Sequence, residues 1–251
     1  MLTVTNEALV RRQVRKGNLF LVASMLVFAA GFTVTCLAPQ HEPNPLVSTF
    51  SLAALLLGIF LWQVSYYFIR RWGPRYRQDA ALARTLRGLD NRYVFVSFAD
   101  PRLPDYLLLG PHGVRVLVPR AVTGTVRCQN DRWARAETPR WLAFLFGDPV
   151  RNPTAEATQG ISQVQRYLEQ RLGADEARQV PVSATIVFLD PKVRLEINGC
   201  AFPVTRLRDL RAHILRDKGP LSPAQQTQLR QLFSPPGASA AAGSAARGAR
   251  R

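Results

Sequence analysis

The chain has 251 residues, with 33 Lys and Arg against 17 Asp and Glu and a formal net charge of +16. Its three cysteines form no CxxC pair and its three histidines are scattered, so their spacing gives no sign of a structural zinc site or a catalytic triad. This cysteine pattern fits a reducing compartment.

Two long apolar runs lie near the N-terminus, at residues 18–39 and 46–69, joined by a loop at 40–45. Neither run contains Asp, Glu, Lys, Arg or His. About 20 helical residues cross the ~30 Å hydrocarbon core of a bilayer, so each run is long enough to span it. The pair predicts a transmembrane helical hairpin.

The flanking charges predict the orientation of the hairpin. Cytoplasmic flanks collect Lys and Arg, whereas translocated loops avoid them, and the loop at 40–45 holds neither. We therefore expect a cell-membrane protein with two spans and both termini in the cytoplasm, with 1–17 as a basic N-terminus. The basic flanks are Arg11, Arg12, Arg15 and Lys16 before the first run, and Arg70, Arg71, Arg75 and Arg77 after the second.

Two other interpretations of the runs stay open. A cleaved signal peptide could end near residues 34–38, but the first run is too long for one and a second run follows at once. Two buried core helices of a water-soluble protein are the other possibility, against which the matched basic flanks argue.

The first half of the remaining chain predicts mainly strands. We expect a helix at 76–90, strands at 92–98, 105–110 and 113–119 with a turn at Pro111-His112, and one more strand within 124–136. Residues 137–150 are apolar and irregular and fit no class.

The second half predicts a long helix and a second group of strands. Asn152 is the expected N-cap, with Pro153 in the first turn and Gly173 at the end. Strands follow at 180–189, 193–197 and near 202–204; Thr205 then caps a helix, and a C-terminal helix occupies 218–233. The tail at 234–251 has a composition typical of disorder. The fold class is thus α/β: a hairpin and one mixed α/β domain at 76–217.

The basic charge of this domain suggests two kinds of partner. Residues 72–233 hold 24 Lys and Arg against 15 Asp and Glu. A tethered basic surface attracts anionic lipid headgroups, and the same charge attracts nucleic acid. Because the hairpin already explains attraction to the bilayer, the charge alone gives little support for nucleic-acid binding.

Several short motifs within 76–217 follow one another in a particular order. They are Asp105–Gly110, Pro111–Val114, Gly124, Trp133, Asn152-Pro153 with Gln159, and residues 182–188. In order and spacing they resemble the nuclease-related domain (NERD) family. The resemblance implies a restriction-endonuclease-like fold, in which an Asp and a Glu hold a divalent cation such as Mg²⁺ while a Lys assists the attacking water.

The sequence departs from this pattern at the residues that matter for cleavage. Val118 occupies the Glu position, Arg120 the Lys position, and Asp105 is retained. Asp79, shifted by one residue from an upstream Glu of the family, could supply a carboxylate. Val118 cannot ligate a metal, and Arg120, with a pKa above about 12, is a poor proton-transfer group. We expect a degenerate site that binds no metal. Mg²⁺ is expected as a cofactor only if the chain is an active nuclease.

Each candidate also has a structural interpretation. Asp105 could be a turn residue, and Arg120 could be a solvated strand end or a headgroup contact. Asn152, Gln159 and Gln163 could line a vestigial pocket or form an exposed helix face.

Three functions follow from these features. The first is a non-cleaving, membrane-tethered binding or scaffold module. The second is a metal-dependent nuclease with a migrated carboxylate, for which Asp79, Asp100, Asp131 and Glu137 are candidates. The third is a membrane assembly protein that works through its hairpin, with a protein partner or a second copy of itself. Small residues that could pack the spans are Ala23, Ala29, Ala30, Gly31, Ser51, Ala54 and Gly58.

Overall fold

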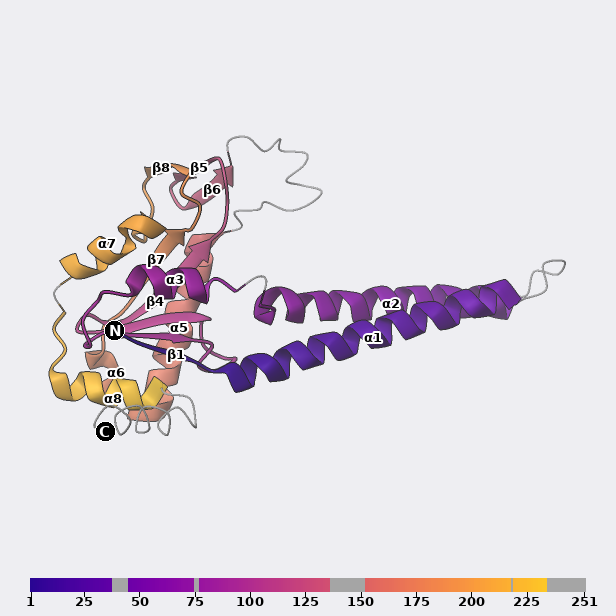
Figure 1. Ribbon diagram of the computed structural model, residues 1–251, viewed down its shortest axis with the longest axis horizontal. Coiled ribbons are helices and arrows are strands. Elements are labelled where there is room, and N and C mark those ends of the chain that lie inside the picture. Colours follow the sequence, from indigo (N-terminus) through magenta and orange to yellow (C-terminus); the bar gives the residue numbers. More distant parts are fainter. Residues whose placement is uncertain (38–44, 75–76, 136–151, 218, 234–251) are drawn as a thin grey trace, which may run out of the picture. The chain divides into compact units, whose positions relative to one another are not determined.

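The computed structural model describes residues 1–37, 45–74, 77–135, 152–217 and 219–233. The chain divides into two compact units (Figure 1). One is Glu7–Arg77. The other combines Met1–Asn6 with the chain from Gln78 onward. The predicted loop at 40–45 lies almost wholly outside the described residues, and the predicted irregular segment at 137–150 and the tail at 234–251 lie entirely outside them.

The first unit is a hairpin of two long helices, α1 (Glu7–Leu37) and α2 (Pro45–Trp72). Both are long and apolar enough to cross a membrane. Only 11% of the most apolar window of each helix is buried, so neither helix is the core helix of a soluble domain. The helices extend beyond the apolar runs because the basic flanks continue the helical turns.

Small side chains line the contact between α1 and α2. The buried positions of α1 repeat every seven residues, a spacing that keeps one seam of a helix against its partner. They are Val10, Gly17, Ser24 and Gly31, and α2 contributes Ala54, Gly58, Ser65 and Trp72. Among the small residues singled out in the sequence, Gly31, Ala54 and Gly58 lie in this contact, whereas Ala29 and Ala30 are exposed.

Two reciprocal hydrogen bonds join the helices. The Ser24 hydroxyl donates to the Gly58 carbonyl at 3.0 Å, and the Ser65 hydroxyl donates to the Gly17 carbonyl at 2.9 Å. A Cβ on Gly58 would meet the Phe28 ring at 2.5 Å. The two helices therefore approach more closely than larger residues would allow.

The second unit is built on a six-stranded sheet with strand order β1-β2-β3-β4-β7-β9. Its strands are β1 (Leu2–Thr5), β2 (Val94–Ser97), β3 (Tyr106–Gly110), β4 (Gly113–Arg120), β7 (Val182–Phe188) and β9 (Val204–Arg206). The β2-β3-β4 strands are antiparallel neighbours, while β1 is parallel to β2, and β7 is parallel to both β4 and β9.

Helices cover both faces of this sheet. On one face, α5 (Pro153–Leu172) and α8 (Pro223–Phe233) join a single apolar core with every second strand residue, including Val94, Leu107, Val116 and Ile186. Residues of the other parity, such as Phe95, Leu108 and Val187, are buried on the opposite face, beside α3 (Asp79–Leu86) and α7 (Leu210–Arg216).

A second, three-stranded sheet has the order β6-β5-β8. It consists of β5 (Thr125–Gln129), β6 (Arg132–Arg135) and β8 (Arg194–Asn198). The turn between β5 and β6 has positive φ at both Asn130 (48°) and Asp131 (61°), the backbone of a type I′ hairpin. The prediction of a single strand within 124–136 is therefore wrong, because this turn divides the segment into the two strands β5 and β6.

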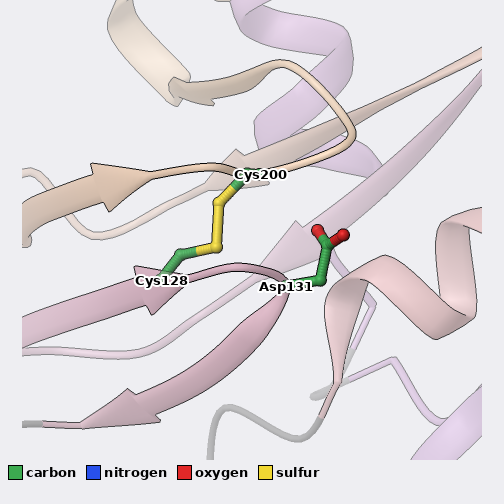
Figure 2. Close-up of side chains that lie close together, drawn as sticks. All are labelled: Cys128, Asp131 and Cys200. Carbon is green, nitrogen blue, oxygen red and sulfur yellow. A yellow bond between two sulfur atoms is a disulfide. The ribbon is translucent and has the colours of Figure 1, made fainter.

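A disulfide joins Cys128 of β5 to Cys200, which follows β8 (Figure 2). Cys36 is free and exposed. The prediction of a reducing compartment did not anticipate this bond, since disulfides are rare there. No local spacing could reveal it, because 72 positions separate the two residues.

The remaining differences from the predicted elements are local. Strand β1 occupies part of the N-terminus that was expected to be only a basic flank. A short helix, α6 (Ala174–Gln179), was not expected. Thr205 lies in β9 rather than capping a helix, and a 3-10 turn (η1, Leu207–Asp209) precedes α7. The expected strands at 105–110 and 113–119, their turn, and the helix from Asn152 to Gly173 are confirmed.

Candidate functional site

The predicted site residues Val118 and Arg120 lie at the end of β4, on the face of the sheet that α5 covers. Val118 is 1% exposed and belongs to the apolar core. Its side chain therefore packs as a core residue, and no polar group replaces the carboxylate that the family pattern has there.

Arg120 makes an ion pair with Glu156 in the first turn of α5. Its Nη2 donates to Glu156 Oε2 at 2.6 Å, and its Nη1 donates to the Pro119 carbonyl at 3.0 Å. The Arg120 side chain is 12% exposed and that of Glu156 is 51% exposed. The interpretation of Arg120 as a solvated strand end is therefore wrong, because the α5 carboxylate holds it against the protein.

Asp105 immediately precedes β3 and is half-buried. Its carbonyl accepts a hydrogen bond from the Phe98 amide at 2.8 Å, which fixes the start of the strand. The antiparallel register pairs Leu107 with Val116, and the same register extended by two residues sets Asp105 opposite Val118. Asp105, Val118 and Arg120 thus lie at one edge of the sheet, the edge where β3 begins and β4 ends.

The start of α5 lies against the same edge. A Cβ on Gly160 would meet Val116 at 2.9 Å and Pro104 at 3.3 Å, so the helix passes close to the residue before Asp105. Asn152 is the N-cap, accepting from the Ala155 amide at 3.1 Å, as predicted. Gln159 is exposed and Gln163 is half-buried, on the flank of the helix that carries Glu156.

Asp79 lies apart from this group. It begins α3, and the amide of the preceding Gln78 donates to the Tyr106 hydroxyl at 3.0 Å. Tyr106 stacks with Phe95, which faces away from α5. Side chains alternate along a strand, so Asp79 and Asp105 lie on opposite sides of the sheet and cannot share one cation.

The other carboxylates considered for a migrated site have structural roles or lie elsewhere. Asp100 accepts from the Arg102 amide at 2.8 Å and forms a local turn. Asp131 accepts from the Ala201 amide at 2.9 Å and from the Thr154 hydroxyl at 3.1 Å. Glu137 lies outside the described residues.

One group of potential metal ligands does occur within the described part of the chain. Cys128, Asp131 and Cys200 present ligand atoms within 4.8 Å of one another (Figure 2). However, the two sulfur atoms are bonded to each other, and one oxygen of Asp131 accepts two hydrogen bonds. In this state the group fastens the small sheet to the start of α5 and does not suit a metal.

The edge at β4 and α5 contains two carboxylates and one cation. Glu156 was missed in the sequence, although an acidic residue in the first turn after an Asn-Pro helix start is a local signal that could have found it. A Mg²⁺ site needs two or more hard oxygen ligands, and here one carboxylate is already paired with a guanidinium. Because Arg120 already neutralises Glu156, the arrangement does not offer the two free carboxylates that a Mg²⁺ ion would need.

Comparisons with protein-family models, curated proteins and solved structures give no match to this chain.

Proposed function

We propose that the α1–α2 hairpin anchors this protein in a membrane and holds the α/β unit at its cytoplasmic surface as a non-cleaving binding module. The observation that carries the anchor is the outer surface of the hairpin. After the small residues pack together, large apolar side chains remain exposed on both helices, as a lipid environment favours and water does not. Examples are Leu26 (66% exposed), Phe32 (71%) and Phe60 (63%).

The sheet supports placing both ends of the hairpin on one side of the membrane. Strand β1 precedes α1, β2 follows α2, and the two pair along their whole length, from Leu2–Val94 to Thr5–Ser97. The basic flanks then favour the cytoplasmic side, where they would meet anionic headgroups. Removal of a signal peptide is disfavoured because it would take β1 out of the sheet.

The end of β4 supports a domain that does not cleave nucleic acid. The resemblance to the NERD family aligns Val118 with a metal-binding Glu, and Val118 is a core residue. Arg120, which aligns with the family's Lys, is held in an ion pair with Glu156. These features support a domain of nuclease ancestry that binds a partner, with nucleic acid, a protein or a second copy as candidates.

One observation favours the nuclease as a second candidate. Glu156 reaches the end of β4 from α5, so it could serve as the migrated carboxylate beside Asp105. Incubating the full chain in detergent with Mg²⁺ or Mn²⁺ and single- or double-stranded DNA or RNA separates the two. We expect no cleavage. Cleavage that is lost in both Asp105→Asn and Glu156→Gln would establish the nuclease instead.

Cys36 offers a direct test of the anchor and its orientation. In a Cys128→Ser/Cys200→Ser chain it is the sole thiol, near the C-terminal end of α1. We expect a membrane-impermeant maleimide to label it in intact cells. In the same chain with Cys36→Ser and Arg12→Cys, labelling should require lysis. The reverse pattern would place the α/β unit outside, where its disulfide is stable, and extraction of the chain by alkaline carbonate would refute the anchor.

A further inference from the structure

A group of polar side chains is buried on the face of the sheet away from α5. At its centre is Arg115 of β4, which is 5% exposed. Its Nε donates to the Ser183 hydroxyl of β7 at 3.2 Å, and its Nη2 pairs with Asp217 at the end of α7. Since Leu108 and Leu117 are its neighbours on this face, the guanidinium is held in an otherwise apolar layer.

Polar atoms around Arg115 have no hydrogen-bond partner among the described residues. They are Arg115 Nη1, both ring nitrogens of His112 and His213 Nε2. His112 is 6% exposed. Buried donors left unpaired are costly and uncommon in folded proteins, so several in one place indicate a site built to meet a polar group.

The Asp217 carboxylate differs from the rest of the group because it is partly exposed to solvent, at the C-terminal end of α7. Its side chain is 46% exposed, whereas that of Arg115 is 6% exposed. The hydrogen bond from Arg115 lowers the pKa of Asp217, so this partner is an anion at neutral pH. A carboxylate that enters from an exposed helix end can leave without disturbing the core.

We propose that Arg115 is the centre of an oxyanion-binding site, and that Asp217 is an internal carboxylate which an external phosphate group can replace. A guanidinium binds phosphate or carboxylate through two parallel hydrogen bonds, and here Nη1 and Nη2 supply them. A ring N–H of His112 supplies a further donor. A small phosphate monoester fits this donor set, because all of its oxygens are acceptors.

His112 is suited to this role in its neutral form. Burial, and after it the positive charge of Arg115, lowers its pKa to about 4. At pH 7 the ring therefore carries one N–H donor without adding a second buried charge. The site does not depend on membrane insertion, so it stands or falls apart from the proposed anchor.

The test measures the thermal midpoint of the full chain in detergent against inorganic phosphate, with chloride at matched ionic strength. Asp217→Asn removes the competing negative charge, and we expect it to lower the apparent phosphate dissociation constant at least tenfold relative to the natural chain. The matched control is Asp90→Asn, which removes an exposed carboxylate paired with Arg92 at 2.7 Å and should leave the phosphate response unchanged. Equal responses of the two variants would overturn the proposal.

A second pair of measurements keeps the test valid if Asp217→Asn folds poorly. His112→Phe removes the ring N–H and should weaken the phosphate response of the natural chain several-fold; an unchanged response would count against the site. Glycerol 3-phosphate and a nucleoside 5′-monophosphate, titrated in the same way, distinguish a lipid-type from a nucleotide-type phosphate ester as the preferred source.

Discussion

Val118 and Arg120 are two residues apart on β4, yet they meet different surroundings. Val118 is enclosed by the core, and Arg120 reaches the first turn of α5, where Glu156 holds it. A nuclease of the resembled family would have a carboxylate at one and an amine at the other. We therefore expect the residue types at positions 118 and 120 to govern whether this edge of the sheet can bind a cation.

Restoring the family residues should create a metal site at a cost in stability. Val118→Glu with Arg120→Lys buries a carboxylate beside Asp105, and we expect it to destabilise the chain by about 3 kcal/mol in EDTA. Mn²⁺ should raise the thermal midpoint again. The matched control is Val116→Glu, equally buried but opposite Leu107, which Mn²⁺ should not rescue. Equal behaviour of the two variants would contradict the placement of Asp105.

His112 makes the stability of the α/β unit depend on pH. Its pKa is about 4 when folded and about 6.5 when unfolded, so the unfolded chain binds a proton that the folded chain rejects. The stabilisation is complete above pH 6.5 and is lost as the pH falls toward 4, by roughly 3 kcal/mol. His213, whose pKa burial also lowers, adds to the same slope.

Urea unfolding of the full chain in detergent between pH 7.5 and 4.5 measures this slope. His112→Phe should flatten most of it, because the ring that must be charged is gone. Asp217, whose pKa the hydrogen bond from Arg115 lowers from its ordinary value of 3.8, also stabilises the fold less as the pH falls, but it does so below this pH range. A slope in His112→Phe equal to that of the natural chain would show that other groups titrate in this range.

At the scale of elements, the hairpin depends on close approach at glycine. Gly58→Leu would drive a side chain into the Phe28 ring and push α1 and α2 apart. The hydroxyls of Thr35 and Ser51 lie 2.7 Å apart, so a Thr35→Cys/Ser51→Cys pair in a Cys36→Ser background reports the separation through its cross-linking yield.

We expect Gly58→Leu to reduce that cross-linking strongly. Ala53→Leu is the control, since position 53 is exposed on the outer surface of α2 and should tolerate the same side chain. Undiminished cross-linking in Gly58→Leu would mean that the helices are not held by this contact.

Elements with local signals were predictable from the sequence, and those fixed by distant partners were not. The β3–β4 turn is marked in the sequence by Pro111-His112, and α5 is marked by its capping residues Asn152 and Gly173. Strand β1 has only four residues, and its partner β2 lies about 90 positions away. The predicted site residues Asp105, Val118 and Arg120 were brought to one edge, but Glu156 was missed. Arg115 could have been noticed in the sequence, because it is a cation in the middle of an otherwise apolar strand.

At the scale of the whole molecule, the α/β unit is not a continuous segment of chain. Met1–Asn6 belongs to it, and the hairpin separates this piece from the rest. A fragment that begins after α2 lacks β1 and exposes the edge of β2, whose four residues are all buried in the intact chain. Exposed apolar edges of this kind promote aggregation.

Two shortened chains test this division. We expect residues 78–233 alone to aggregate, and residues 1–6 joined to residue 78 by a flexible Gly/Ser linker to be monomeric, as measured by size-exclusion chromatography with light scattering. Linking a scrambled 2–5 segment is the control and should behave like the shorter chain. A monomeric 78–233 fragment would show that β1 is dispensable for folding.

The position of β1 also orders events during biosynthesis. It is made before the two helices of the hairpin, and β2 is made after them. In a membrane, β1 and β2 can then pair only when two spans, and not one, have been inserted, since otherwise the bilayer separates them. If the hairpin is a membrane anchor as proposed, we expect completion of the sheet to depend on correct insertion, because a chain that crosses the membrane once would retain an open edge at β2.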